Sequence, residues 1–162
     1  MRTEPLTEFE LGYIAGFLDG EGHITIMRSY PSRARYKMGF HSIQTVMANN
    51  KVKVLEWIQE RIGGAIYCQE NTDGSRGNRK TAYRLVLSGQ KSREFLMTIA
   101  PYVILKGEQI ALALEYLKLG HGTNPTARAA MCDRMRALNK RGWIGQQNGQ
   151  QPDVSHKTPD QS

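Results

Sequence analysis

Three glycines spaced four residues apart place the strongest constraint on how this chain can fold. Gly12, Gly16 and Gly20 lie in the stretch LGYIAGFLDGEG, and in a helix this spacing puts them in one line along one face. Each glycine inside a helix costs up to about 1 kcal/mol relative to alanine, so a close contact must offset that cost. The spacing therefore predicts a helix face on which a second helix packs, with Ala15 beside the glycine line.

Local signals define the limits of this helix. Thr7 and Glu10 form a capping box, in which each side chain bonds the backbone N–H of the other residue. We therefore expect a helix from about Glu8 to Asp19, with a second, apolar side that faces the core. The apolar side contains Leu11, Ile14 and Leu18.

The stretch from Ile14 to Gly22, IAGFLDGEG, resembles the signature motif of the LAGLIDADG homing endonucleases. It departs from that motif by apolar exchanges, by Gly for Ala, and by Glu for the second Asp. The resemblance implies an α+β fold of order αββαββα, with a four-stranded antiparallel saddle sheet. It also implies a site-specific endonuclease that cuts double-stranded DNA. The alternative interpretation is an amphipathic core helix with a glycine-rich C-terminal cap.

Composition favours a nucleic acid as the partner. The 162 residues suit one domain, and the net charge of +7 indicates a polyanionic partner, either nucleic acid or an acidic membrane surface. No apolar run approaches the roughly 20 residues that span a bilayer, and residues 1–10 are too polar for a secretory signal. We therefore expect an intracellular protein without a membrane partner. The two cysteines, Cys68 and Cys132, are too few for a disulfide framework or a zinc site.

The hydrophobic pattern predicts two strand pairs, each followed by a helix with an apolar stripe, and this agrees with the αββαββα order. The sheet would carry helices on one face and leave the other free to enter the DNA major groove. Domain 1–141 holds the positive charge, because the Gln-rich segment 142–162, predicted as a flexible tail, carries −1. We expect strands at 22–30, 35–47, 65–69 and 81–88, and helices at 51–62, 90–100, 108–119 and 126–140, the later ones added beyond the core order.

The resemblance assigns a metal-dependent site at the end of the motif. Glu21 would supply a carboxylate ligand and Gly20 a carbonyl ligand to Mg²⁺, which Ca²⁺ or Mn²⁺ could replace in a crystal. Asp19 would be a helix-terminal cap. One carboxylate per chain is too few to build a metal site for hydrolysis. We therefore expect a homodimer in which two Glu21 side chains converge. In this dimer Gly12, Ala15 and Gly16 would pack against the second copy.

Three further residues are carried into the site by the resemblance. Lys106 and Lys51 match basic residues near the scissile phosphate, and Gln44 is the candidate for positioning water. The family often has a glutamine where this chain places Met47, and methionine cannot order water. This departure is the only feature of the sequence that points to a catalytically inactive member of the family.

Outward residues of the strands and their loops are the candidates for reading DNA bases, because arginine pairs with guanine and glutamine with adenine. A phosphate contact or a solvated charge is the alternative for each of them. The candidates are Thr25, Met27, Ser29, Arg33, Arg35, Ser42, Gln44, Arg76, Arg79 and Arg84.

Three functions follow from these features. The first is a homodimeric homing endonuclease that cuts a long pseudo-palindromic target and is encoded by a mobile intron. The second is an RNA maturase that binds its host intron, since a basic groove suits either nucleic acid. The third is a catalytically silent DNA-binding regulator, which the retention of Asp19 and Glu21 disfavours.

Overall fold

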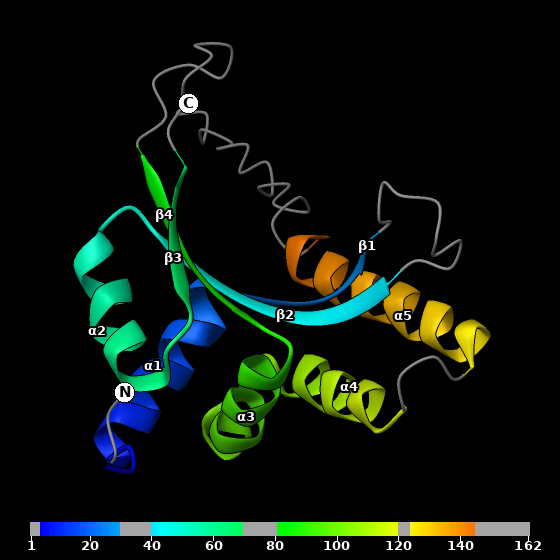
Figure 1. Ribbon diagram of the computed structural model, residues 1–162, viewed down its shortest axis with the longest axis horizontal. Coiled ribbons are helices and arrows are strands. Elements are labelled where there is room, and N and C mark those ends of the chain that lie inside the picture. Colours follow the sequence, from blue (N-terminus) through cyan, green and yellow to red (C-terminus); the bar gives the residue numbers. More distant parts are fainter. Residues whose placement is uncertain (1–3, 30–39, 70–80, 120–123, 145–162) are drawn as a thin grey trace, which may run out of the picture.

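The computed structural model describes residues 4–29, 40–69, 81–119 and 124–144, and Figure 1 shows their arrangement. The order of elements is the predicted αββαββα, followed by further helices. The elements are α1 (Glu8–Glu21), β1 (Gly22–Ser29), β2 (Phe40–Asn49), α2 (Val52–Ile62), β3 (Ala65–Gln69), β4 (Ala82–Ser88), α3 (Gln90–Ile99), the 3₁₀ helix η1 (Ala100–Tyr102), α4 (Gly107–Lys118) and α5 (Pro125–Ile144).

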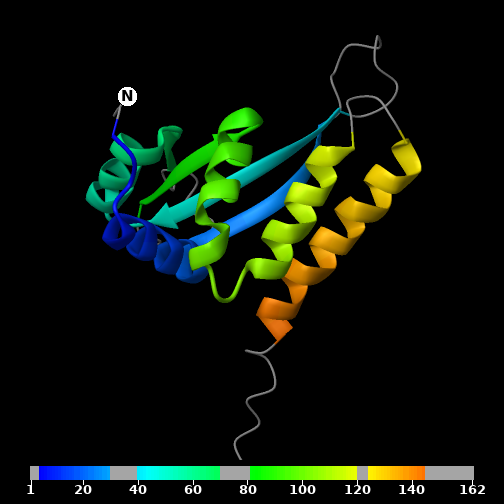
Figure 2. The ribbon, with the colours of Figure 1, turned by 90° about the horizontal axis from the view of Figure 1, so that it is seen from below.

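The four strands form one antiparallel sheet, as predicted, and their order in the sheet is β1-β2-β4-β3. The sheet is strongly curved, and α3 and α4 lie on its convex side (Figure 1). Figure 2, seen from below, shows α4 in front of the strands, and Figure 1 shows that none of the described helices covers the concave face. The protein is therefore a helix layer with an open, curved sheet on top.

The core lies between the sheet and the helices. Ile24 on β1 and Leu85 on β4 are fully buried on the helix side of their strands, and they meet Ile14 and Leu18 of α1 in one apolar cluster. Burial of each such side chain contributes about 1.5–3 kcal/mol. Residues alternate along β1: Ile24 and Ile26 face inward, whereas His23 and Met27 are exposed on the other side.

The helix predicted at 51–62 is α2, and its N-cap residue is Lys51, without a side-chain cap. Asn49 and Asn50, just before it, are of the residue type that favours an N-cap. The Asn49 Oδ1 accepts a hydrogen bond from the Lys51 backbone N–H at 2.9 Å, so this side chain stabilises the turn before the helix. Asparagine favours both positions, and sequence cannot distinguish them.

The helix predicted at 90–100 is α3, which ends at Ile99, and Pro101 lies in the first turn of the 3₁₀ helix η1 that follows, where proline is tolerated. At the C-terminal end, α5 runs to Ile144, so the backbone of residues 142–144 is helical although the sequence assigned it to the tail. Residues 145–162 lie outside the described part.

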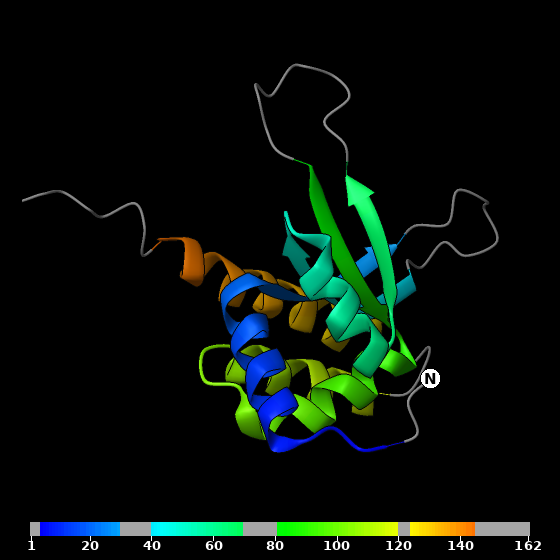
Figure 3. The ribbon, with the colours of Figure 1, turned by 90° about the vertical axis from the view of Figure 1, so that its left-hand side faces the viewer.

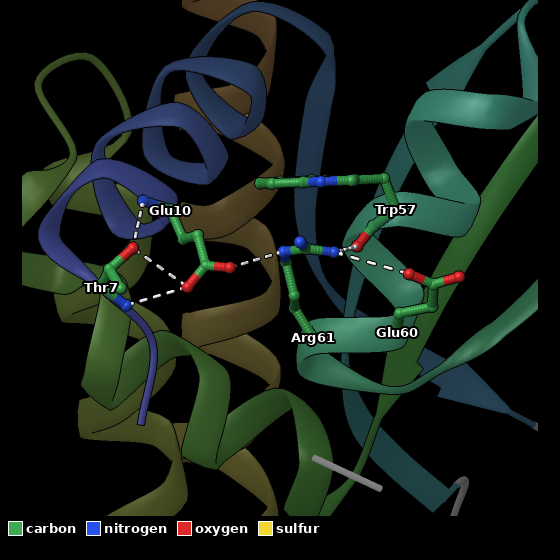
Figure 4. A network of polar contacts seen from close by, with 5 residues as sticks. All are labelled: Thr7, Glu10, Trp57, Glu60 and Arg61. Atoms are coloured by element: carbon green, nitrogen blue, oxygen red, sulfur yellow. Dashed lines mark hydrogen bonds and ion pairs between the residues drawn. The ribbon is translucent and has the colours of Figure 1, made fainter. Parts of the chain in front are cut away.

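A polar network joins the start of α1 to α2 (Figure 4). The predicted capping box is present: Thr7 Oγ1 accepts from the Glu10 N–H at 3.3 Å, and Glu10 Oε2 accepts from the Thr7 N–H at 2.9 Å. The other Glu10 oxygen accepts from Arg61 Nε at 2.8 Å. The Arg61 guanidinium lies 3.7 Å from the centre of the Trp57 ring, and that ring packs edge-on against Tyr13. This network fixes α1 against α2.

At the opposite edge of the sheet, α5 runs beside β1. Asn139 Nδ2 donates to the Ile24 carbonyl at 3.0 Å and satisfies part of the free edge of that strand. None of the helices in the described part of the chain is long and apolar enough to cross a membrane.

Candidate functional site

The glycine line of α1 faces open space. Gly12, Gly16 and Gly20 are exposed, and a Cβ added to any of them would meet no heavy atom within 4 Å. Figure 3 shows α1 on the outer flank of the molecule. Ala15, predicted to lie on the same contact face, is instead fully buried in the core of the chain. We define the exposed glycines 12, 16 and 20 as the glycine ridge.

The end of α1 carries charges that its own dipole disfavours. Asp19 and Glu21 lie in the last turn, where the helix presents its negative pole, and this turn contains no basic residue. Gly22 follows, and a Cβ there would collide with Leu18 as the chain turns into β1. Groups from elsewhere in the chain must therefore offset the negative charge.

Residues 104–106, which immediately precede α4, provide this compensation. Asp19 Oδ2 accepts from the N–H groups of Ile104 at 2.8 Å and Leu105 at 3.1 Å, and Oδ1 accepts from the Lys106 N–H at 3.1 Å. Lys106 Nζ donates to the Asp19 carbonyl. Asp19 is thus a cap, as predicted, but it caps the segment that leads into α4 and not the end of its own helix.

Lys106 therefore lies beside both acids of the motif, as its predicted role requires. Partial burial lowers the pKa of its ammonium group, and the negative charges of Asp19 and Glu21 oppose that shift. Glu21 itself is exposed at the end of the glycine ridge. The structure thus brings together two of the predicted catalytic residues, Glu21 and Lys106.

His23 is a residue of this site that the sequence interpretation missed. Partial burial lowers the pKa of its imidazole, and the nearby Lys106 charge lowers it further. The alternation of β1 places it on the open face, two residues after Glu21. That position was readable from the strand pattern, but the sequence interpretation gave His23 no role beyond a surface or strand residue.

Met47 belongs to the core. Its Cα partner across the sheet is Gly22, which places it near the end of α1, but its side chain is fully buried on the helix side. Gln44 lies on the open face opposite Thr25, about 10 Å along the strand from the Gly22 pair. Lys51 is exposed just beyond β2, at the end of the strand that pairs with Gly22.

The open face of the sheet gathers several residues predicted to read DNA. Thr25 pairs with Gln44 and Met27 with Ser42, and Arg84 is exposed on β4. Tyr67 on β3, which is 59% exposed and pairs with Arg84, also lies on this face, although no such role was predicted for it. Of the remaining candidates, Ser29 is described only by its backbone in β1, while Arg33, Arg35, Arg76 and Arg79 lie outside the described residues.

The donor atoms at the end of α1 suit a hard divalent cation. Mg²⁺ prefers oxygen ligands and is often held by one or two carboxylates. The exposed Glu21 carboxylate and the Gly20 carbonyl, at the negative pole of the helix, supply oxygen donors. Within the described residues, no group of three or more His, Cys, Asp or Glu side chains could hold a metal ion in one chain.

The topology and the motif together define a class: an α+β domain with the homing-endonuclease fold. No protein-family model and no curated protein matches the sequence. Solved structures of homing endonucleases do match the fold, and the predicted resemblance is confirmed at that level.

Three of these structures illustrate the match. Homing endonuclease I-CvuI, in complex with the I-CreI target, is 21% identical with a TM-score of 0.64, over 81% of this chain and 82% of that one. The archaeal intron-encoded homing endonuclease I-Vdi141I, complexed with DNA, is 20% identical with a TM-score of 0.65, over 81% of this chain and 84% of that one. The LAGLIDADG homing endonuclease I-GzeII, in complex with a DNA target, is 13% identical with a TM-score of 0.54, over 79% of this chain and 43% of that one. The chain therefore has the fold of the LAGLIDADG homing endonucleases.

Proposed function

We propose that this protein is an intracellular LAGLIDADG homing endonuclease that cuts both strands of a long, pseudo-palindromic DNA target as a homodimer. The observation that carries the proposal is the exposed glycine ridge, which ends at the exposed Glu21 with Lys106 held beside it. The solved structures of the same fold include DNA complexes.

The surface around the glycine ridge supports the homodimer. At one end of α1, Phe9 is 76% and Tyr13 44% exposed; beside the other end, Ile104 is 87% and Leu105 73% exposed. Burial of this apolar surface by a second copy would stabilise a dimer, because apolar burial contributes about 25 cal/mol per Å². A two-fold axis along the ridge would bring two Glu21 side chains together and present equivalent groups to both DNA strands.

The open face of the sheet supports DNA binding. Its described polar side chains include Thr25, Ser42, Gln44 and Arg84, and the chain carries a net charge of +7. A curved antiparallel ribbon of this kind can lie in the major groove, where each base pair presents a distinct pattern of donors and acceptors. A concave sheet face such as the one in Figure 1 can accommodate the convex surface of a duplex.

The residues at the end of α1 fit phosphodiester hydrolysis. When bound, Mg²⁺ would lower the pKa of a water and stabilise the charge on the attacking and leaving oxygens. Glu21 and the Gly20 carbonyl would hold that ion. Lys106 would place a positive charge next to the scissile phosphate, because its partly buried ammonium group lies near both acids of the motif, Asp19 and Glu21.

The test begins with selection of bound DNA from a random library by the purified protein in Ca²⁺. The selected duplexes, and the presumptive intron-insertion sequence, are then incubated with Mg²⁺ or with EDTA. We expect double-strand cuts with Mg²⁺ only. Glu21→Gln should abolish cleavage and retain DNA binding, whereas Glu56→Gln, the same change at an exposed site on α2, should cut normally.

Three results would contradict the proposed nuclease function. One is cleavage that survives Glu21→Gln. Another is tight binding of the host intron RNA without DNA cleavage, which would support the maturase. The third is specific DNA binding without cleavage in Mg²⁺ or Mn²⁺, which would support the silent regulator.

A further inference from the structure

We propose that Asp19 is a positioning residue, which holds Lys106 next to Glu21 through its carboxylate and its backbone carbonyl. The proposal rests on the nuclease function above, in which Lys106 and Glu21 act at the phosphate. It adds a residue to that site and gives the first acid of the motif a role distinct from that of the second.

Both oxygens of the Asp19 carboxylate are engaged by the segment before α4. Three consecutive backbone N–H groups, of Ile104, Leu105 and Lys106, converge on it at 2.8–3.1 Å. An ionised carboxylate accepts at both oxygens, whereas an amide has one accepting oxygen and an NH₂ group that would face these donors. The geometry is therefore specific for aspartate over its closest isostere, asparagine.

Lys106 is held at both ends by the same residue. Its backbone N–H donates to the Asp19 carboxylate and its Nζ donates to the Asp19 carbonyl. The side chain is thus fixed at its base and at its charged tip. Because α1 places Asp19 two residues before Glu21, the ammonium group and the Glu21 carboxylate occupy one region.

Apolar burial does not hold the segment that leads to Lys106. Ile104 and Leu105, the two residues before it, are 87% and 73% exposed in the single chain. The backbone of Ile104 and Leu105 is instead held by the hydrogen bonds that their N–H groups donate to the Asp19 carboxylate. Loss of these bonds should let Lys106 move by an ångström or more, and a misplacement of that size can lower a rate about 100-fold.

Two measurements test the proposal. Hydrogen–deuterium exchange on the protein without DNA compares wild type, Asp19→Asn and the control Glu115→Gln, which makes the same change at an exposed site on α4. Single-turnover cleavage of the selected target, with protein in excess, compares wild type, Asp19→Asn, Lys106→Met and the double variant. The affinity for DNA and the thermal midpoint are measured for each.

We expect Asp19→Asn to speed exchange at the amides of residues 104–106 at least about 10-fold and Glu115→Gln to leave them unchanged. The cleavage rate of Asp19→Asn should fall about 10- to 100-fold with little change in Kd. Because Asp19 acts through Lys106, the double variant should cut no more slowly than Lys106→Met alone.

Several results would overturn this role. Unchanged exchange at 104–106 would show that Asp19 does not hold the segment. Additive losses in the double variant, or a lower thermal midpoint with a normal rate per bound complex, would make Asp19 a merely structural residue. Wild-type protein that cuts no selected target would overturn the nuclease and the catalytic role together, while the exchange result alone would still decide whether Asp19 holds the segment.

Discussion

Arg61 Nε lies 2.8 Å from Glu10 Oε1, and this ion pair joins the first turn of α1 to the last turn of α2. The Glu10 carboxylate is almost fully buried, with 8% of its side chain exposed, and it also closes the capping box with Thr7. The pair therefore fixes the helix that carries the glycine ridge. Its energetic weight is greater than that of a surface ion pair, because a buried charge without its partner is strongly destabilising.

We expect Arg61→Met to lower the free energy of unfolding by roughly 3 kcal/mol, because it leaves the Glu10 charge buried and removes the cation over Trp57. Chemical denaturation measures the change. Glu60→Gln is the control: Glu60 lies 3.6 Å from Arg61 with 74% of its side chain exposed, so its loss should cost less than about 0.5 kcal/mol. Equal losses in the free energy of unfolding for the two variants would show that Arg61 does not stabilise the buried Glu10 carboxylate.

The glycine ridge leads to a prediction about assembly. Gly16→Leu introduces a side chain into open space in the single chain and improves helix propensity, so the monomer should remain folded. The same side chain would separate two ridges that pack together. We expect this variant to be a folded monomer in analytical ultracentrifugation at concentrations where wild type is a dimer. Glu115→Leu, which adds an exposed leucine on α4, should stay dimeric, and a dimeric Gly16→Leu would argue against the ridge as the interface.

The parts of the fold predicted from sequence depend on local chemistry. The capping box of Thr7 and Glu10 defines the start of α1, and the alternation of Ile24 and Ile26 defines the inner face of β1. Both signals lie within a few residues of the feature that they specify. The order of helices and strands follows for the same reason.

The faces of β2 were not predictable, because a contact distant in sequence decides them. Thr45 is fully buried, and its hydroxyl shares a 2.7 Å hydrogen bond with Ser92, 47 residues away. A polar residue therefore faces the core while Val46 lies on the open side, which hides the alternation. The hydrogen bonds between Asp19 and residues 104–106 were not predictable for the same reason, since these partners lie 85 to 87 residues from Asp19 in the sequence.

The placement of Arg84 on the open face leads to a prediction about DNA affinity. An arginine that contacts a phosphate releases counterions, so Arg84→Ala should weaken DNA binding and reduce the slope of log K against log salt by about 1. Arg93→Ala is the control, because Arg93 is an exposed arginine on α3, on the helix side of the sheet. Fluorescence anisotropy between about 50 and 200 mM salt measures both. Equal slopes for Arg84→Ala and wild type, with relaxed preference at one base pair, would show that Arg84 reads a base.

Tyr116 leads to a prediction about alkaline stability. This tyrosine of α4 is buried, and its hydroxyl accepts a hydrogen bond from Arg128 at 2.9 Å. Burial raises its pKa above the ordinary value of 10.0, and the Arg128 charge only partly opposes that shift. The unfolded chain therefore loses the phenolic proton at a lower pH than the folded protein. Its contribution to stability is complete below about pH 10 and is lost as the pH rises through the folded pKa.

We expect Tyr116→Phe to flatten the fall in the free energy of unfolding between pH 8 and 11, at a cost of about 1 kcal/mol at neutral pH for the lost hydrogen bond. Urea denaturation at several pH values measures both effects. Tyr67→Phe is the control, because Tyr67 is 59% exposed on β3 and should leave the slope as in wild type. A Tyr116→Phe profile parallel to wild type would show that other groups cause the alkaline loss of stability, since removal of the buried phenol would then not change the number of protons released on unfolding.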